Sequence, residues 1–174
     1  MPTPIGHALA GMAAGVVPAS FGIVHRRRTL APLVVTYACL GMAPDLDFLF
    51  GLHSSYTHSV GATLVAALVS VASVRSSGLA LGVSAGAAYG SHLLLDWLGT
   101  DNVAPFGIMA LWPFSDGYHL AGTNWFVAVC RQYWRAACWW QLVQAVILEV
   151  VLLGPIAALG ILLARRTRRY DTLS

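Results

Sequence analysis

The sequence predicts an all-α membrane protein, a polytopic bundle of about four to five helices, and two observations lead to that prediction. Of its 174 residues, 57% are hydrophobic and only 10% are charged, whereas soluble domains carry about 25% charged residues. The mean hydropathy is +0.70, and the apolar residues gather in runs approaching the roughly 20 residues that a membrane helix needs. We therefore expect a single membrane-embedded domain over residues 1–174.

The apolar runs define the expected helices in chain order. They are Pro4 to Val24, Thr29 to Pro44, Ser59 to Val74, Leu79 to Leu98 and Cys138 to Ala164. The second run is short and stops at Asp45-Leu46-Asp47. No basic residue precedes the first run, as one would in a secretory signal, so we expect it to remain as a helix. Residues 99–137 are rich in glycine, proline and aromatic residues, which predicts a connection outside the membrane.

Arginine clusters orient these helices. Arg26 to Arg28, Arg75 and Arg165 to Arg169 close alternate runs, and arginine-rich ends favour the cytoplasm. The amino terminus and the connections at residues 45–58 and 99–137 then face the non-cytoplasmic side of an inner membrane. Arginine beside apolar runs indicates contacts with membrane lipids and not with nucleic acid.

The three cysteines, Cys39, Cys130 and Cys138, have neither a metal-binding nor a redox spacing. Their odd number does not complete a set of disulfides. We interpret all three as apolar, space-filling side chains.

Hairpin geometry predicts that polar residues of separate runs meet in one layer. If the first two runs fold back near residue 26, His7 lies level with Asp45 and Asp47. If the next two fold back at residues 75–78, His58 lies level with His92 and Asp96. Each arm measures about 25 Å of helix, so both sets reach the non-cytoplasmic face. His92 and Asp96, four residues apart, project from the same side of their helix.

These residue types predict a metal centre. Imidazole and carboxylate together suit zinc, manganese or iron better than calcium or magnesium, and the number of candidates suggests two ions. The candidate ligands are His7, Asp45, Asp47, His58, His92 and Asp96. Gly11 and Gly15 lie on the same helix face as His7, at intervals of four residues, and Gly82, Gly86 and Gly90 are spaced in the same way. Such glycines would let neighbouring helices approach closely.

Each candidate also has a purely structural interpretation. His92 could be a hydrogen-bonded core histidine, and the two aspartates near residue 46 could only end a helix. His53 and His119 lie in expected loops, where histidine is common. Glu149 lies near the middle of the last run, far from the predicted layer, and suggests an interhelical hydrogen bond or a pathway residue.

Arg131 and Arg135 form a second pair spaced by four residues, on the side where arginine is disfavoured. They are either a solvated face or a substrate-binding pair that holds an anionic group such as phosphate.

The spaced motifs resemble a known family. They are His7, Ala43-Pro44-Asp45-Leu46-Asp47, Tyr56-Thr57-His58-Ser59, His92-Leu93-Leu94-Leu95-Asp96 and Trp112-Pro113-Phe114-Ser115. Over about residues 1–116 they resemble the YdjM-like family, which implies a membrane-bound metal-dependent hydrolase. The ligand order is also similar to that of zinc-dependent phospholipase C enzymes. That similarity implies one zinc ion on His7 and Asp96 and another on Asp47, His58, His92 and the bridging Asp96.

The resemblance implies cleavage of a phosphoester or pyrophosphate of a lipid or amphiphile at the outer membrane face. The expected catalytic residues are Asp45, Asp47, His58 and Asp96, with Asp45 as general base or as partner of a ligand if it binds no metal. The alternative is a metal-ion transporter or channel component in which the same residues line an ion route. Transporters place their sites near the midplane of the membrane, so the gathering of polar residues at one face favours the enzyme.

Overall fold

The computed structural model describes residues 1–21, 30–51, 54–73, 78–130, 132 and 134–171. Within these residues the chain forms five α-helices and one 3-10 helix, and no β-strand. The helices are α1 (Pro4–Phe21), α2 (Leu30–Met42), η2 (Ala43–Phe50), α3 (Val60–Ala72), α4 (Gly78–Leu98) and α5 (Ala136–Asp171). The all-α prediction is therefore confirmed for the described part of the chain.

Among the described residues, three helical stretches are long and apolar enough to cross a membrane: Leu30–Phe50, Gly78–Leu98 and Ala136–Thr167. The apolar parts of the other two helices, Pro4–Pro18 and Val60–Ala72, are shorter. Length and composition thus support three crossings, fewer than the predicted four to five.

Two expected helix ends lie elsewhere in the structure. The second run does not stop at Asp45 but tightens into η2, which continues to Phe50 and ends at Gly51 with a φ of 70°. Pro44 is tolerated at the start of η2, where its missing N–H leaves no hydrogen bond unmade. The last helix also continues past Ala164 to Asp171, because the arginines that follow are good helix formers.

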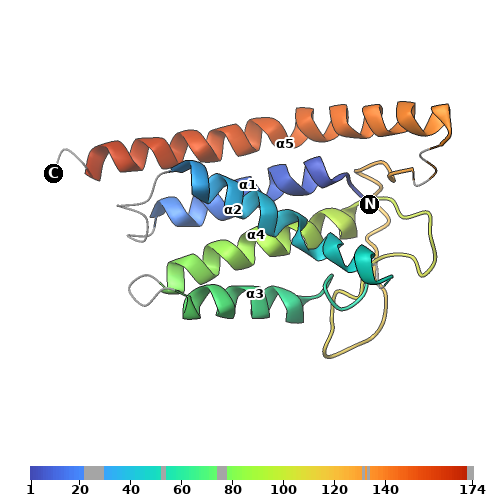
Figure 1. Cartoon of the computed structure of the whole chain (residues 1–174), viewed down its shortest axis with the longest axis horizontal. Coiled ribbons are helices and arrows are strands. Elements are labelled where there is room, and N and C mark those ends of the chain that lie inside the picture. Colours follow the sequence, from blue (N-terminus) through green and yellow to red (C-terminus); the bar gives the residue numbers. More distant parts are fainter. Residues whose placement is uncertain (22–29, 52–53, 74–77, 131, 133, 172–174) are drawn as a thin grey trace.

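Helix α1 lies at the centre of the bundle, where it packs against α2, α4 and α5. Figure 1 shows α5 along one side of the bundle and α3 along the other, where α3 packs on α4. A Cβ at Gly11 of α1 would lie 2.8 Å from the Cα of Gly41 in α2, so the two backbones touch there. This contact confirms the predicted close approach beside His7.

The second glycine stripe is also a packing surface. A Cβ at Gly86 would lie 3.3 Å from the side chain of Ala67, and one at Gly90 would lie 3.4 Å from Thr63. Both neighbours belong to α3. The stripe on α4 therefore seats α3, as the glycine spacing predicts.

The connection between α4 and α5 folds over the end of the bundle at which α1 begins (Figure 1). Its backbone bonds to helix ends: Val60 N–H donates to Ala110 O at 2.9 Å, and Trp125 N–H donates to Leu98 O at 3.0 Å. The isolated bridge between Ile108 and His119 closes a loop within it. The described part of this connection is therefore tied to the helices that carry the predicted layer.

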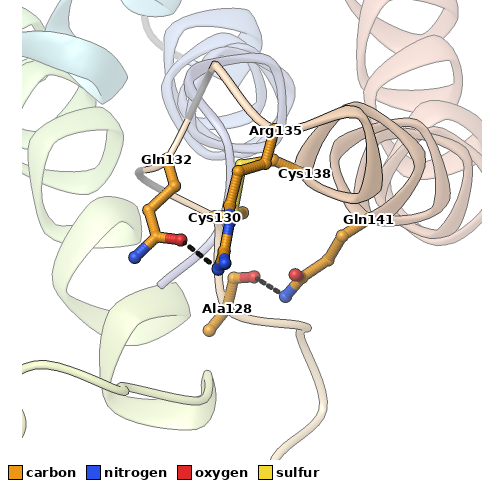
Figure 2. The surroundings of a disulfide bond; sticks show 6 residues. All are labelled: Ala128, Cys130, Gln132, Arg135, Cys138 and Gln141. Carbon is orange, nitrogen blue, oxygen red and sulfur yellow. Dashed lines mark hydrogen bonds between the residues drawn. A yellow bond between two sulfur atoms is a disulfide. The ribbon is translucent and has the colours of Figure 1, made fainter.

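A disulfide joins Cys130, at the end of that connection, to Cys138 in the first turn of α5 (Figure 2). The interpretation of these two cysteines as space-filling residues is wrong. Their Cα atoms lie only 5.3 Å apart, and the sequence spacing carries no signal of that proximity. Gln141 adds a second tie by donating to Ala128 O at 2.8 Å. Cys39 is a free, exposed cysteine.

Candidate metal centre

His92 and Asp96 occupy the last two turns of α4, and both side chains are buried. The Nδ1 atom of His92 lies 2.7 Å from the carbonyl oxygen of Gly41. A carbonyl only accepts, so Nδ1 is the donor and the lone pair of Nε2 points the other way. Nε2 lies 3.2 Å from Oδ2 of Asp96. A backbone contact on one side of the ring thus fixes the ligating atom on the other.

His58 enters the same space from the loop before α3. The Ser59 side chain accepts from Ala62 N at 3.1 Å and caps α3, which holds His58 at the start of that helix. Its Nδ1 lies 3.1 Å from Oδ2 of Asp47, and its Nε2 lies 3.1 Å from Nε2 of His92. Burial lowers the pKa of His58, but hydrogen bonds to the two nearby aspartates outweigh it and raise that pKa above its ordinary value.

His7 completes the cluster from α1. Its Nε2 lies 3.4 Å from Oδ1 of Asp96, and its ring stacks on that of His92 with centroids 3.6 Å apart. Nδ1 of His7 and both carboxylate oxygens of Asp96 are buried and have no hydrogen-bond partner. Buried polar atoms are normally hydrogen-bonded. The unbonded atoms of His7 and Asp96 are therefore arranged for a partner other than a protein hydrogen bond.

Asp45 differs from the other members of the cluster in being partly open. Its Oδ1 lies 3.5 Å from Nε2 of His58 and 3.5 Å from Nε2 of His92. The side chain is 29% exposed, whereas both histidines are 0% exposed. Asp45 is therefore where this cluster meets the molecular surface.

The donor atoms fit a transition-metal ion. They form two overlapping groups, His7 with His92 and Asp96, and Asp45 with His58 and His92, each with ligand atoms within 4.8 Å of one another. With bonds of about 2.0–2.1 Å, neighbouring ligands of tetrahedral zinc are about 3.3 Å apart. The separations of 3.1–3.5 Å among the Nε2 and carboxylate atoms match that value.

The two facing imidazole nitrogens strengthen this fit. His58 and His92 each direct Nδ1 at an oxygen acceptor, so their Nε2 lone pairs point at each other across 3.1 Å. Two lone pairs at that distance repel unless a cation or a proton lies between them. Asp96 adds charge on two sides, since Oδ1 faces His7 and Oδ2 faces the other two histidines.

A family model for the YdjM inner membrane protein matches residues 1–169. The chain belongs to the YdjM inner membrane protein family. Curated proteins and solved structures yielded no match. The family match extends well beyond residues 1–116, which carry the resemblance of the motifs, and it takes in most of α5. As a YdjM member the chain is a membrane protein, with possible metal-binding groups in its described part.

The structure places Asp47 of this YdjM member beside the two groups and in neither of them. Its carboxylate lies behind His58 and accepts from the Thr57 hydroxyl at 2.7 Å. Arg135 is exposed and donates to the Gln132 side chain at 2.8 Å (Figure 2). Arg131 and His53 lie outside the described residues. His119 pairs its backbone with Ile108 and belongs to neither metal group.

Glu149 lies much closer to the metal centre than the sequence predicts. Its carboxylate accepts from Thr3 N at 2.7 Å and from the Thr3 hydroxyl, and a Cβ at Gly6 would lie 2.7 Å from its Cδ. Helix α5 begins beyond the layer of candidate metal ligands, and Glu149 lies roughly 20 Å of helix after its start. Glu149 is therefore level with the start of α1. Glu149 thus bonds α5 to the residue that precedes α1, next to the expected interhelical contact, whereas the expected distance from the layer is wrong.

A pocket of about 320 Å³ opens beside Asp45. It is lined by Met1, Pro2, Pro4, Asp45, Phe48, Asp101, Asn102, Val103, Ala128 and Val129. Asp101 shapes its rim by accepting from the backbone N–H groups of Val103 and Gly107 at 3.1 and 2.9 Å. These lining residues come mostly from irregular segments, where helical periodicity gives no signal, and none of them is basic.

Proposed function

We propose that this YdjM member is a membrane-bound, metal-dependent hydrolase that cleaves a phosphoester or pyrophosphate bond of a lipid or amphiphile at the outer membrane face. The observation that carries the proposal is the position of Asp45. This residue contacts two buried histidines of the metal groups and also lines a pocket of about 320 Å³. A cluster that only stabilised the fold would need no such opening.

The donor set supports two divalent transition-metal ions, with zinc preferred and manganese or iron also suited. His7 and Oδ1 of Asp96 would contribute to one ion, and Asp45, His58, His92 and Oδ2 of Asp96 to the other. Bound ions of this kind supply a Lewis acid and lower the pKa of a water molecule.

The protein side chains would orient the reacting groups. Asp45 contacts both histidines through Oδ1 and lines the pocket. Its other carboxylate oxygen would hold a water molecule by hydrogen bonding and accept its proton. Asp47 holds the His58 ring through Nδ1, and Gly41 holds His92 in the same way. Both contacts keep the two Nε2 atoms in position through the reaction.

The pocket walls favour an amphiphilic substrate. Phe48, Val103 and Val129 supply apolar surface, and Phe48 remains 64% exposed. The described lining residues carry no basic side chain, so the metal ions would supply positive charge for an anionic group. Arg135, which bonds to Gln132, does not line this pocket. It would help to bind the anionic group of a substrate only from a position closer to the pocket.

The same end of the molecule carries the disulfide, which supports an outward-facing site. Disulfides persist in oxidising compartments such as the periplasm, and Cys130 directly follows the pocket residue Val129. Arg165 and Arg166 lie near the opposite end of α5, the end that the positive-inside rule assigns to the cytoplasm.

A metal transporter is the competing function, and Glu149 weighs against it. This carboxylate is the one acidic group in the middle of α5, but Thr3 engages both of its oxygens. It is therefore already bonded within the fold and is not free to line an ion route.

The test uses purified protein in detergent or in vesicles, loaded with zinc or manganese and given a panel of phospholipids and prenyl phosphates. We expect the wild type to release a water-soluble phosphate product and His58→Ala to abolish that release. His119→Ala is the matched control, because it removes a histidine outside both metal groups and should retain activity. No release across the panel, together with metal uptake into sealed vesicles, would favour the transporter.

A further inference from the structure

A second cavity lies far from the metal centre, between α2 and α5. Its volume is about 820 Å³, within the range of roughly 300–1,000 Å³ that is typical of ligand sites. Its walls are Leu30, Ala31, Val34 and Val35 of α2, and Ile161, Leu162, Arg165 and Arg166 of α5. None of these residues touches the candidate metal groups.

The groove arises from the way the helices pack. Helix α1 packs against both α2 and α5 and separates them at this end. A buried cluster that includes Val16 of α1, Leu33 of α2 and Ala164 of α5 joins the three helices, and Leu30 and Val34 pack against it. The adjacent surface is open, since Val35 is 61% and Leu162 53% exposed. Both walls belong to stretches that are long and apolar enough to cross a membrane, so in a bilayer the groove would face lipid chains.

Charge distinguishes this groove from an ordinary lipid-facing surface. Arg165 and Arg166 are both exposed and line the groove one turn beyond Ile161 and Leu162. Among the described residues no carboxylate forms an ion pair with either guanidinium, and no acidic residue lines the groove. Two guanidinium groups beside an apolar channel match a phosphate headgroup joined to acyl chains.

We propose that this groove binds an anionic phospholipid, with its phosphate on Arg165 and Arg166 and an acyl chain between α2 and α5. Guanidinium binds phosphate in a bidentate geometry, and net positive charge at the groove favours a lipid with net negative charge. The site lies at the end opposite the metal centre, so its occupancy does not depend on the proposed hydrolase activity.

Native mass spectrometry of the full chain, titrated with phosphatidylglycerol or phosphatidylcholine in detergent, tests the proposal. We expect one phosphatidylglycerol to bind with clear preference. Each arginine is worth about 1 kcal/mol near an anionic surface, so replacing both, as Arg165→Gln with Arg166→Gln, should weaken binding about 30-fold. Gln144→Ala is the control, because it changes an exposed side chain of α5 outside the groove and should leave binding unchanged.

Two further arms identify the ligand. Val35→Trp should block the groove and reduce lipid binding while leaving both arginines in place, and millimolar inorganic phosphate should not displace the lipid if the acyl chain contributes. Equal binding of the two lipids, an unchanged affinity in the double arginine variant, or an unchanged affinity in Val35→Trp would each overturn the proposal. Displacement by inorganic phosphate would also overturn it, in favour of a simple anion site.

Discussion

Asp47 lies behind His58, with its Oδ2 3.1 Å from the Nδ1 atom of that ring, whereas Asp45 lies in front of the same ring, with its Oδ1 3.5 Å from Nε2. The two carboxylates are two residues apart in η2 and therefore meet the histidine from opposite sides. The position of Asp45 suits a metal ligand, and the position of Asp47 suits a residue that orients the His58 ring.

This difference predicts unequal effects of two matched substitutions. Asp47→Asn should weaken metal binding by about 10–100-fold, the usual cost of losing an outer partner of a ligand. Asp45→Asn should cost more, because it removes a charged donor. Competition with a chelator of known affinity measures both. If Asp47→Asn proved the more damaging change, the two residues would exchange roles.

Asp96 should control the metal content of the whole centre. Its two oxygens face His7 on one side and His58 and His92 on the other. We expect the wild type to hold about two transition-metal ions, since the ligands outnumber those of one tetrahedral ion, and Asp96→Ala to lose most of both. Elemental analysis of the purified protein measures this, with His119→Ala as the control. Wild-type protein that stays metal-free after metal supply would argue against the centre.

Glu149 should affect one side of the centre more than the other. The Thr3 hydroxyl accepts from Gly6 N at 3.3 Å and donates to Glu149, and His7 N–H donates to Thr3 O at 3.1 Å. Glu149→Ala removes the acceptor for two buried donors, at a cost of about 1–3 kcal/mol each, and loosens the turn that carries His7.

The metal content of Glu149→Ala should therefore fall by about one ion of the two, because Asp45 and His58 do not depend on this turn. Gln144→Ala, an exposed change on the same helix, should keep the wild-type content. Equal loss of both ions in Glu149→Ala protein that still shows a cooperative thermal unfolding transition would mean that Glu149 supports the bundle as a whole and does not act through His7.

Membrane orientation can be tested with single cysteines in a chain in which Cys39 is replaced by alanine and the disulfide is kept. A cysteine in place of Asp116, which is exposed in the α4–α5 connection, should react with an impermeant maleimide added outside the cell. One in place of Arg166, exposed near the end of α5, should react only after lysis. The reverse pattern would place the metal centre in the cytoplasm.

The sequence by itself determined the helices and the layer of polar residues. Apolar run length and the four-residue spacing of His92 and Asp96 are local properties, and two hairpins of similar length bring His7 and His58 to the same depth. Tertiary structure decided which side of His58 each aspartate meets, because rotation within the 3-10 turn separates residues only two positions apart. It also decided the pairing of Cys130 with Cys138 and the contact between Glu149 and Thr3. Those contacts depend on where α5 begins relative to α1, which only the packing of the helices against one another sets.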